Sequence, residues 1–193
     1  MTKARGPQGQ LVASALNPGE MPRDGRPEVA FLGRSNAGKS SLINALLGSK
    51  AAHTSATPGR TQRIHFYAMP TWYIVDLPGF GYARASQKSR EAFGQAVENY
   101  LTLRQPLIGA VLIQDARRDL EDEEEMIVHW ADSRNILLVV AAGKMDRLNR
   151  AEQKERHGRL EEQYGRPVLL ISNRTGEGLE GVRGAIRSLG LSI

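Results

Sequence analysis

Gly33-Arg34-Ser35-Asn36-Ala37-Gly38-Lys39-Ser40 is the stretch that decides the fold of this chain. Apolar residues 29–32 precede it and predict a strand, and residues 40–47 predict a helix. Gly33 and Gly38 permit backbone angles that a side chain forbids, so the loop can turn its N–H groups toward a phosphate chain. The start of the helix adds its positive dipole end. The stretch therefore predicts a phosphate-binding loop for a nucleoside triphosphate.

Three side chains near this loop predict a site for Mg²⁺ and the terminal phosphates. Lys39 supplies a positive charge for the phosphates, and the Ser40 hydroxyl is a Mg²⁺ ligand. Asp76 ends the strand predicted at 72–76 and is expected to reach the same ion, often through a water. Leu77, Pro78 and Gly79 follow, and the Gly79 N–H can approach the terminal phosphate. By itself this tetrapeptide also suits an ordinary turn, but the phosphate loop upstream favours the functional interpretation.

Two further segments predict that the base is guanine. Gly143-Lys144-Met145-Asp146 follows the apolar strand predicted at 135–141. A carboxylate only accepts hydrogen bonds, and guanine presents two adjacent donors that adenine lacks, so Asp146 favours guanine. The stem of Lys144 can lie along the base plane. Ser172-Asn173 follows the last predicted strand, 168–171, where backbone N–H groups can meet the guanine O6.

The polar segment Thr57-Pro58-Gly59-Arg60-Thr61-Gln62-Arg63 lies between the first helix and the second strand. Either Thr57 or Thr61 can offer a second hydroxyl to Mg²⁺ once this loop closes over the γ-phosphate. We predict Thr61, because it lies next to the strand. The alternative is a flexible polar loop until nucleotide binds.

The composition indicates a folded, cytoplasmic protein without a membrane span. The chain has 193 residues, of which 40% are hydrophobic and 24% charged, which suits one α/β domain. It has no cysteine, which excludes disulfides and fits a reducing compartment. The longest apolar run, 136–142, is too short to cross a bilayer, and the polar residues 1–10 lack a signal core. The net charge of +5 suits a polyanionic partner such as RNA.

The order of the predicted elements indicates a three-layer α/β sandwich with a six-stranded, mostly parallel sheet. The two strands at 63–68 and 72–76 are joined by a turn too short for a crossover, so one strand is expected to run antiparallel. Further strands are predicted at 107–114, 135–141 and 168–171, and helices at 86–104, 119–131, 150–164 and 179–189. Residues 1–27 are rich in Pro, Gly and Arg and predict a lead-in segment that packs loosely, before a single nucleotide-binding domain at 28–193.

These motifs in this order resemble a small GTPase of the translation-factor-related class. More narrowly, Gly-Arg-Ser-Asn-Ala-Gly-Lys-Ser-Ser, Thr-Pro-Gly-Arg-Thr-Gln and Asp-Leu-Pro-Gly-Phe-Gly-Tyr-Ala resemble the EngB (YihA/YsxC) family of bacterial ribosome-biogenesis GTPases. The resemblance covers nearly the whole chain. It implies a Ras-like domain, Mg²⁺-dependent hydrolysis of GTP to GDP, a role in assembly of the large (50S) ribosomal subunit with rRNA as partner, and a need for the protein in cell division and septation.

Carried onto this sequence, the resemblance assigns roles residue by residue. Catalytic roles fall to Asn36, Lys39, Thr61 and Gly79, and the Mg²⁺ ligands are Ser40, Thr61 and Asp76. The residues expected to contact GTP or GDP are Gly33, Arg34, Ser35, Asn36, Ala37, Gly38, Lys39, Ser40, Ser41, Gly59, Arg60, Thr61, Gln62, Arg63, Asp76, Leu77, Pro78, Gly79, Gly143, Lys144, Met145, Asp146, Ile171, Ser172 and Asn173.

The chain departs from the family pattern at two places in the base-binding motifs. Gly143 stands where the family usually has Thr, and Asn173 stands where it usually has Ser. The base-reading Asp146 is retained. We expect these changes to affect the affinity for the nucleotide rather than its identity.

Phe80 leaves a gap in the expected hydrolytic machinery. Many GTPases place a glutamine directly after Asp-x-x-Gly to orient the attacking water, and Phe80 can neither donate nor accept a hydrogen bond. Intrinsic turnover is therefore expected to be slow. In related GTPases an Asn at the position of Asn36 helps to coordinate K⁺, so K⁺ or the ribosome is expected to complete the site. The other interpretation of Asn36 is a loop residue that satisfies its own backbone.

Three other functions are compatible with parts of the sequence. A small-molecule kinase shares the phosphate loop, but no lid or acceptor pocket is evident. A GTP-gated RNA- or ribosome-binding module with negligible hydrolysis fits Phe80. A GTPase for RNA modification would need an appended domain. The basic residues that flank the two phosphate-sensing loops suit rRNA binding or a solvated charged face; they are Arg60, Arg63, Arg84, Lys88 and Arg90.

Overall fold

The computed structural model describes residues 9–52, 63–80 and 97–193. Within them, seven strands form one sheet in the order β1-β3-β4-β2-β5-β6-β7. The strands are β1 (Gln10–Ala15), β2 (Glu28–Gly33), β3 (Ile64–Ala68), β4 (Tyr73–Asp76), β5 (Leu107–Asp115), β6 (Leu137–Gly143) and β7 (Val168–Leu170). The helices are α1 (Lys39–Leu47), α3 (Asp122–Ser133), α4 (Arg150–Tyr164) and α5 (Leu179–Ser188), with short 3₁₀ turns η1 (Pro18–Glu20) and η2 (Met145–Arg147). Residues 97–103 are also helical.

The pairing directions confirm a mostly parallel sheet. Strand β2 lies between β4 and β5 and is parallel to both, and β6 continues the parallel order to β7. Strand β3 is antiparallel to its neighbours β1 and β4, so among the described strands it alone runs against the others. The turn between β3 and β4 is closed by Met69 N–H donating to Trp72 O at 2.8 Å. The predicted hairpin is therefore confirmed.

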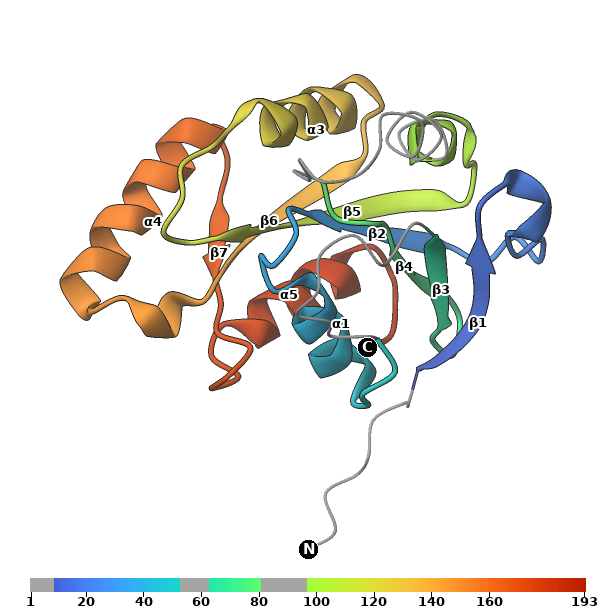
Figure 1. Cartoon of the computed structure of the whole chain (residues 1–193), viewed down its shortest axis with the longest axis horizontal. Coiled ribbons are helices and arrows are strands. Elements are labelled where there is room, and N and C mark those ends of the chain that lie inside the picture. The colour runs from blue at the N-terminus through green and yellow to red at the C-terminus, as the bar shows by residue number, and fades with distance from the viewer. Residues whose placement is uncertain (1–8, 53–62, 81–96) are drawn as a thin grey trace, which may run out of the picture.

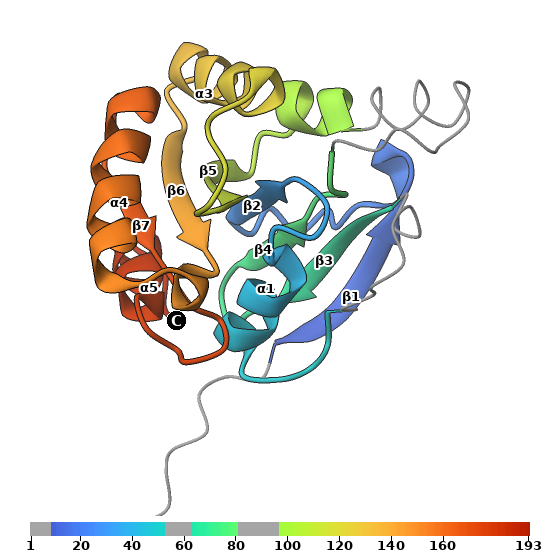
Figure 2. The ribbon, with the colours of Figure 1, turned by 60° about the vertical axis from the view of Figure 1, so that its left-hand side comes forward.

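The predicted count of six strands is wrong, because the N-terminal segment supplies a seventh. Strand β1 pairs with β3 from Gln10 to Ala15, at the edge of the sheet (Figure 2). The prediction that this segment packs loosely fails here for a physical reason. An edge strand needs only one neighbouring strand, and the partner of β1 is β3, about fifty residues away in sequence. A bulge between Leu11 and Ala13 also interrupts the alternation of side chains that would mark a strand in the sequence. Its Ala15 is fully buried, whereas Val12 is half exposed.

Alternate residues of the strands pack on opposite faces, which produces three layers. Ala30, Leu112 and Val140 face a cluster that includes Ile127 of α3 and Leu160 of α4. On the other face, residues such as Phe31, Val111 and Ile113 pack against Leu42, Ile43 and Leu46 of α1 and Val182 and Ile186 of α5. Figure 1 shows α3 on one side of the sheet and α1 and α5 on the other. No helix in the described ranges is long and apolar enough to cross a membrane.

Two elements, β6 and α3, begin two or more residues later than predicted, because backbone geometry overrides the apolar pattern. Strand β6 begins at Leu137 rather than 135, because Asn135 has a left-handed φ of 52°. Helix α3 begins at Asp122 rather than 119, because a turn in which Arg118 N–H donates to Asp115 O at 3.0 Å precedes it. Of the helix predicted at 86–104, only 97–103 falls in the described residues.

Candidate functional site

The predicted phosphate loop joins the end of β2 to the start of α1, as Figure 1 shows. Gly38, the residue before the helix, has a φ of 108°, a conformation that side chains rarely adopt. Asn36 is also left-handed, with a φ of 65°, and is exposed at the rim of the loop. Ala37 is buried. Ser40 and Ser41 lie on the first turn of α1. The loop therefore ends at a helix N-terminus, where backbone N–H groups remain available to an anion.

The Lys39 ammonium donates to the Asp76 carboxylate, so the predicted phosphate ligand and the predicted Mg²⁺ ligand form an ion pair. Both side chains are nearly buried, with 10% of Lys39 and 6% of Asp76 exposed. Strand β4 ends at Asp76 beside β2, which brings the carboxylate to the phosphate loop across the sheet. The structure thus places a cation against the oxygen that is expected to hold Mg²⁺.

Residues 77–80 fold back against the phosphate loop. Phe80 O accepts from Ser35 N–H at 3.1 Å, and Phe80 N–H donates to Gly33 O at 3.4 Å. A Cβ atom on Gly79 would lie 2.8 Å from Ser35 Oγ and 3.1 Å from Ser35 N, so only glycine permits this close approach. The Phe80 side chain packs on the hydrophobic core. It therefore does not replace the missing polar group, in agreement with the sequence.

The predicted base-reading acid is held in place by the last strand-end loop. Asp146 Oδ1 accepts from Ser172 Oγ at 2.7 Å, and its Oδ2 accepts from Arg174 Nε at 2.8 Å. The hydrogen bond from Ser172, followed by that from Arg174, lowers the pKa of Asp146 below its ordinary value. Asp146 is therefore ionised at neutral pH and can only accept hydrogen bonds. Gly143, Met145 and Ile171 are buried behind this pair.

Two side chains from the predicted base motifs bind the carbonyl groups of the phosphate loop. Lys144 Nζ donates to Asn36 O at 2.5 Å, and Asn173 Nδ2 donates to Gly38 O at 3.1 Å. The two halves of the predicted site are more than a hundred residues apart in sequence. These contacts join them into one continuous site.

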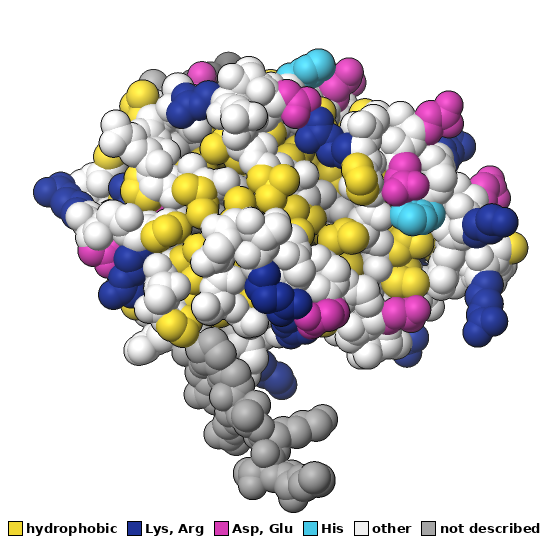
Figure 3. Space-filling view, turned by 180° about the vertical axis from the view of Figure 1, so that it is seen from behind, with side chains coloured by type: hydrophobic (Ala, Val, Ile, Leu, Met, Phe, Trp, Pro, Cys, Tyr) yellow, Lys and Arg dark blue, Asp and Glu magenta, His cyan; other side chains and the backbone are white. Residues whose placement is uncertain are grey.

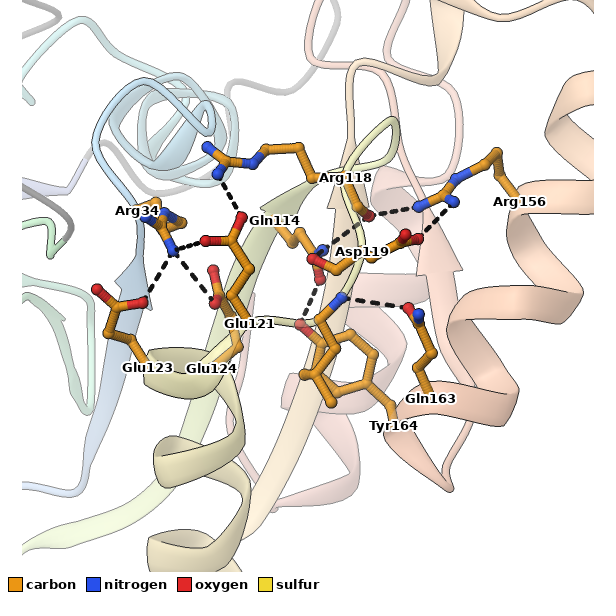
Figure 4. A network of polar contacts seen from close by, with 11 residues as sticks. Arg34, Gln114, Arg118, Asp119, Glu121, Glu123, Glu124, Arg156, Gln163 and Tyr164 are labelled. Carbon is orange, nitrogen blue, oxygen red and sulfur yellow. Dashed lines mark hydrogen bonds and ion pairs between the residues drawn. The ribbon is translucent and has the colours of Figure 1, made fainter.

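A cluster of acids holds the phosphate loop from the other side. Figure 4 shows the Arg34 guanidinium directed at three carboxylates at the start of α3. Arg34 Nη1 donates to Glu121 at 2.7 Å and to Glu123 at 2.9 Å, and it lies 3.7 Å from Glu124. Burial raises the pKa of Glu124, and Arg34 opposes this shift. The Arg34 side chain is therefore committed to α3 rather than to the phosphate pocket.

Comparison with known proteins identifies the family. A family model described as a 50S ribosome-binding GTPase matches residues 28–174. A protein of Leuconostoc citreum named probable GTP-binding protein EngB is 40% identical over 158 residues, which is 81% of each chain. The protein of the same name from Lacticaseibacillus casei is 41% identical over 179 residues and 90% of each chain. This chain belongs to the EngB family of GTP-binding GTPases.

Solved structures agree with the EngB fold. The crystal structure of a probable GTP-binding protein EngB superimposes with a TM-score of 0.69 and 24% identity, over 84% of this chain and 97% of that one. Era of Aquifex aeolicus, solved with GDP and AlF₄⁻, has the same TM-score of 0.69 at 20% identity, over 84% of this chain and 56% of its own. These two likenesses show the fold, and the family itself follows from the sequence matches.

Within this EngB chain the predicted site residues fall into three groups. The phosphate loop, Asp76 to Gly79 and the two base motifs lie together, as described above. Arg63 lies away from them, where its Nη1 donates to Ser14 O at 3.0 Å and to Glu20 at 3.3 Å. The predicted contacts Gly59, Arg60, Thr61 and Gln62, together with Thr57, Arg84, Lys88 and Arg90, lie outside the described residues.

The sequence interpretation overlooked Asp115, the last residue of β5. Its Oδ2 accepts from Lys144 Nζ at 3.1 Å, and its carboxylate also binds Arg117. Its position in the sequence, directly after a predicted buried strand, could have indicated a role in the site. Ligands bind at the carboxyl ends of the strands in such sheets. Asp115 belongs to none of the GTPase motifs, so motif spacing does not point to it.

Proposed function

We propose that this protein hydrolyses GTP in a Mg²⁺-dependent reaction and acts, as a cytoplasmic monomer, as a nucleotide-controlled switch in assembly of the large ribosomal subunit. A requirement for cell division and septation belongs to the same proposal. The main observation in its support is the hydrogen bond from Lys144 Nζ to Asn36 O. This bond connects the motif that contains Asp146 to the loop that contains Lys39. A site built this way accepts a guanine base and its phosphates together. The match to ribosome-binding GTPases supports the ribosome as the partner.

The donor atoms present fit Mg²⁺. Hydroxyl and carboxylate oxygens such as those of Ser40 and Asp76 are the ligands that this ion prefers. Asp76 already binds a cation, the Lys39 ammonium. When GTP binds, we expect Lys39 to turn from Asp76 to the phosphates, with Thr61 as a further ligand of the ion. Bound Mg²⁺ would offset the charge on the phosphate oxygens during phosphoryl transfer.

Slow intrinsic hydrolysis follows from Phe80, and we propose that K⁺ assists through Asn36. The exposed Asn36 stands at the rim of the loop, where a side-chain oxygen can share a monovalent cation with the phosphates. Such a cation would act where charge develops in the transition state. It would replace the group that Phe80 cannot supply.

GTP turnover should be about tenfold to a hundredfold faster in K⁺ than in Na⁺, and Asn36→Ala should abolish that difference. Steady-state phosphate release measured in both buffers, with and without large-subunit particles, tests this. Asn17→Ala, at the start of η1, is the matched control and should keep the K⁺ effect. Equal and fast rates in all four conditions would contradict the proposal.

A second candidate function is a GTP-gated ribosome-binding module with negligible hydrolysis, and the apolar, partly buried Phe80 side chain favours it. Single-turnover hydrolysis on the ribosome separates the two. Complete conversion of bound GTP on the particle supports the GTPase switch, whereas release of intact GTP supports the module.

Basic side chains on the described surface are dispersed or paired with acids, which favours the phosphate-sensing loops as the rRNA contact. On the face opposite that of Figure 1, apolar side chains occupy the middle, and Lys and Arg are dispersed near the rim with Asp and Glu among them (Figure 3). Several described arginines are paired with acids: Arg156 and Arg159 with Asp119, and Arg166 with Asp132. We therefore propose that Arg60, Arg84, Lys88 and Arg90 carry the nucleotide-dependent contact.

Co-sedimentation with ribosomal particles tests the proposed function directly. We expect binding to the large subunit with a non-hydrolysable GTP analogue and release with GDP, because the loops that sense the γ-phosphate also carry the basic residues. The small subunit is the matched control. Equal sedimentation in all nucleotide states would contradict a switch, and failure to bind the large subunit would contradict the assignment of partner.

A further inference from the structure

The side chain of Lys144, in the predicted base motif, is held by two residues outside that motif. Its backbone is left-handed, with a φ of 63°, and 27% of its side chain is exposed. Its stem is expected to lie along the base plane, which requires the ammonium to be anchored beyond the base. The phosphate-loop carbonyl of Asn36 is one anchor, at 2.5 Å. The other is Asp115 Oδ2, at 3.1 Å.

Asp115 is itself rigidly held. Arg117 Nε and backbone N–H donate to its Oδ1 at 2.9 and 3.1 Å, and Arg117 Nη2 donates to its Oδ2 at 2.7 Å. Only 9% of the side chain is exposed. Burial opposes ionisation, but the hydrogen bonds from Arg117 and Lys144 keep the pKa of Asp115 well below its ordinary value. A permanent negative charge therefore stands at a defined point at the end of β5.

There is space for Lys144 to move if that charge is removed. A cavity of about 250 Å³ adjoins the phosphate loop and is lined by Asn36, Asp115 and Lys144, with Arg34 and Arg118 among the other residues around it. Asp115 Oδ2 accepts from both Lys144 Nζ and Arg117 Nη2, so without this carboxylate the two cations would face each other. Lys144 would then keep only the Asn36 carbonyl among its described partners. Repulsion between the Lys144 and Arg117 charges would favour a turn of Lys144 toward solvent and away from the base plane.

We infer that Asp115 is a positioning residue for guanine-nucleotide binding: it holds the Lys144 ammonium on the Asn36 carbonyl, so that the lysine stem is preset along the base. This inference rests on the proposed binding of guanine nucleotide at this site. Asp115 touches neither base nor phosphate in this arrangement, and its whole effect passes through Lys144. The 2-amino group of guanine is read by Asp146, which has no described contact with Asp115.

A double-mutant cycle on the full chain tests this assignment. The affinity for GDP is measured by calorimetry for the wild type, Asp115→Asn, Lys144→Met and the double variant. Asp115→Asn keeps the shape but loses the charge and should weaken GDP binding about tenfold. Lys144→Met should weaken it by a similar or larger factor. Adding Asp115→Asn to Lys144→Met should then cause no further loss.

Two further measurements separate positioning from general damage to the fold. The ratio of affinities for GDP and inosine diphosphate reports on the 2-amino group and should stay at its wild-type value in Asp115→Asn. The melting temperature of each variant shows whether it remains folded. Asp119→Asn, an acid of the same segment that binds Arg156 and Arg159 instead, is the matched control and should bind GDP as the wild type does.

Three outcomes would overturn the inference. They are unchanged GDP affinity in Asp115→Asn, additive losses in the double variant, and a changed ratio for inosine diphosphate. Failure of the wild type to bind GDP would instead contradict the proposed function, so the two failures are distinguishable.

Discussion

Replacing Asp146 with asparagine should change the preferred base of this protein from guanine to xanthine. In the proposed site, the ionised carboxylate would accept from the two adjacent donors of guanine. An amide accepts at one atom and donates at the other, which matches xanthine, where a carbonyl replaces the 2-amino group. A site that leaves a buried hydrogen-bonding group unpaired rejects the wrong ligand by about 10⁴-fold, so we expect a change of that order in the ratio of GDP to xanthosine diphosphate affinity.

Competition calorimetry with the two diphosphates measures this change. Ser172 can still donate to the amide oxygen of Asp146→Asn, and the largely exposed Arg174 side chain is able to move away from the amide nitrogen. Asp132→Asn, on the surface of α3, is the control and should keep the guanine preference. A variant at position 146 that still prefers guanine would show that another group reads the base.

Glu28→Ala should be the most damaging substitution outside the site. Glu28, at the start of β2, is fully buried. The single N–H of Arg104 Nε is shared between the two Glu28 carboxylate oxygens at 3.0 Å each, and Arg104 Nη2 donates to Oε1 at 2.5 Å. Tyr100 donates to Oε2 at 2.9 Å. Removal of one member of a buried ion pair leaves the other charge uncompensated and typically costs about 3–5 kcal/mol.

Urea unfolding with a constant m-value measures the loss. Glu28→Gln keeps an acceptor for Tyr100 and should cost less than Glu28→Ala. Asp132→Ala breaks the exposed pair with Arg166 and should change the free energy of unfolding by less than about 1 kcal/mol. If Glu28→Ala unfolds at the same urea concentration as this control, the buried pair does not stabilise the fold.

The parts of the fold that the sequence predicted well are those with a strong local pattern. Helix α4 has its predicted bounds, since Asn149 and Glu152 cap its start reciprocally and Gly165 follows its end. Residues 107–113 of strand β5 contain no polar side chain, because both faces of the strand are buried. Strand β1 has no such pattern, because an exposed edge strand needs neither continuous apolar residues nor strict alternation.

For the candidate site, motif chemistry predicted which residues gather but not how they pair in this structure. The spacing within Gly33 to Ser40 requires a loop before a helix, so those positions could be read directly. The pairing of Lys39 with Asp76, and of Arg34 with the acids of α3, joins residues from separate elements. No local pattern encodes these partners.

The sequence by itself determined the order of strands and helices from β2 onward, the loop before α1 and the acid proposed to select the base, because these depend on residue type and on spacing of a few positions. Only the tertiary structure decided that Asp115 faces Lys144, that Asn173 binds Gly38 and that Gln10–Ala15 closes the sheet edge. Such contacts depend on how parallel strands align side by side, and that register is set by packing over the whole core.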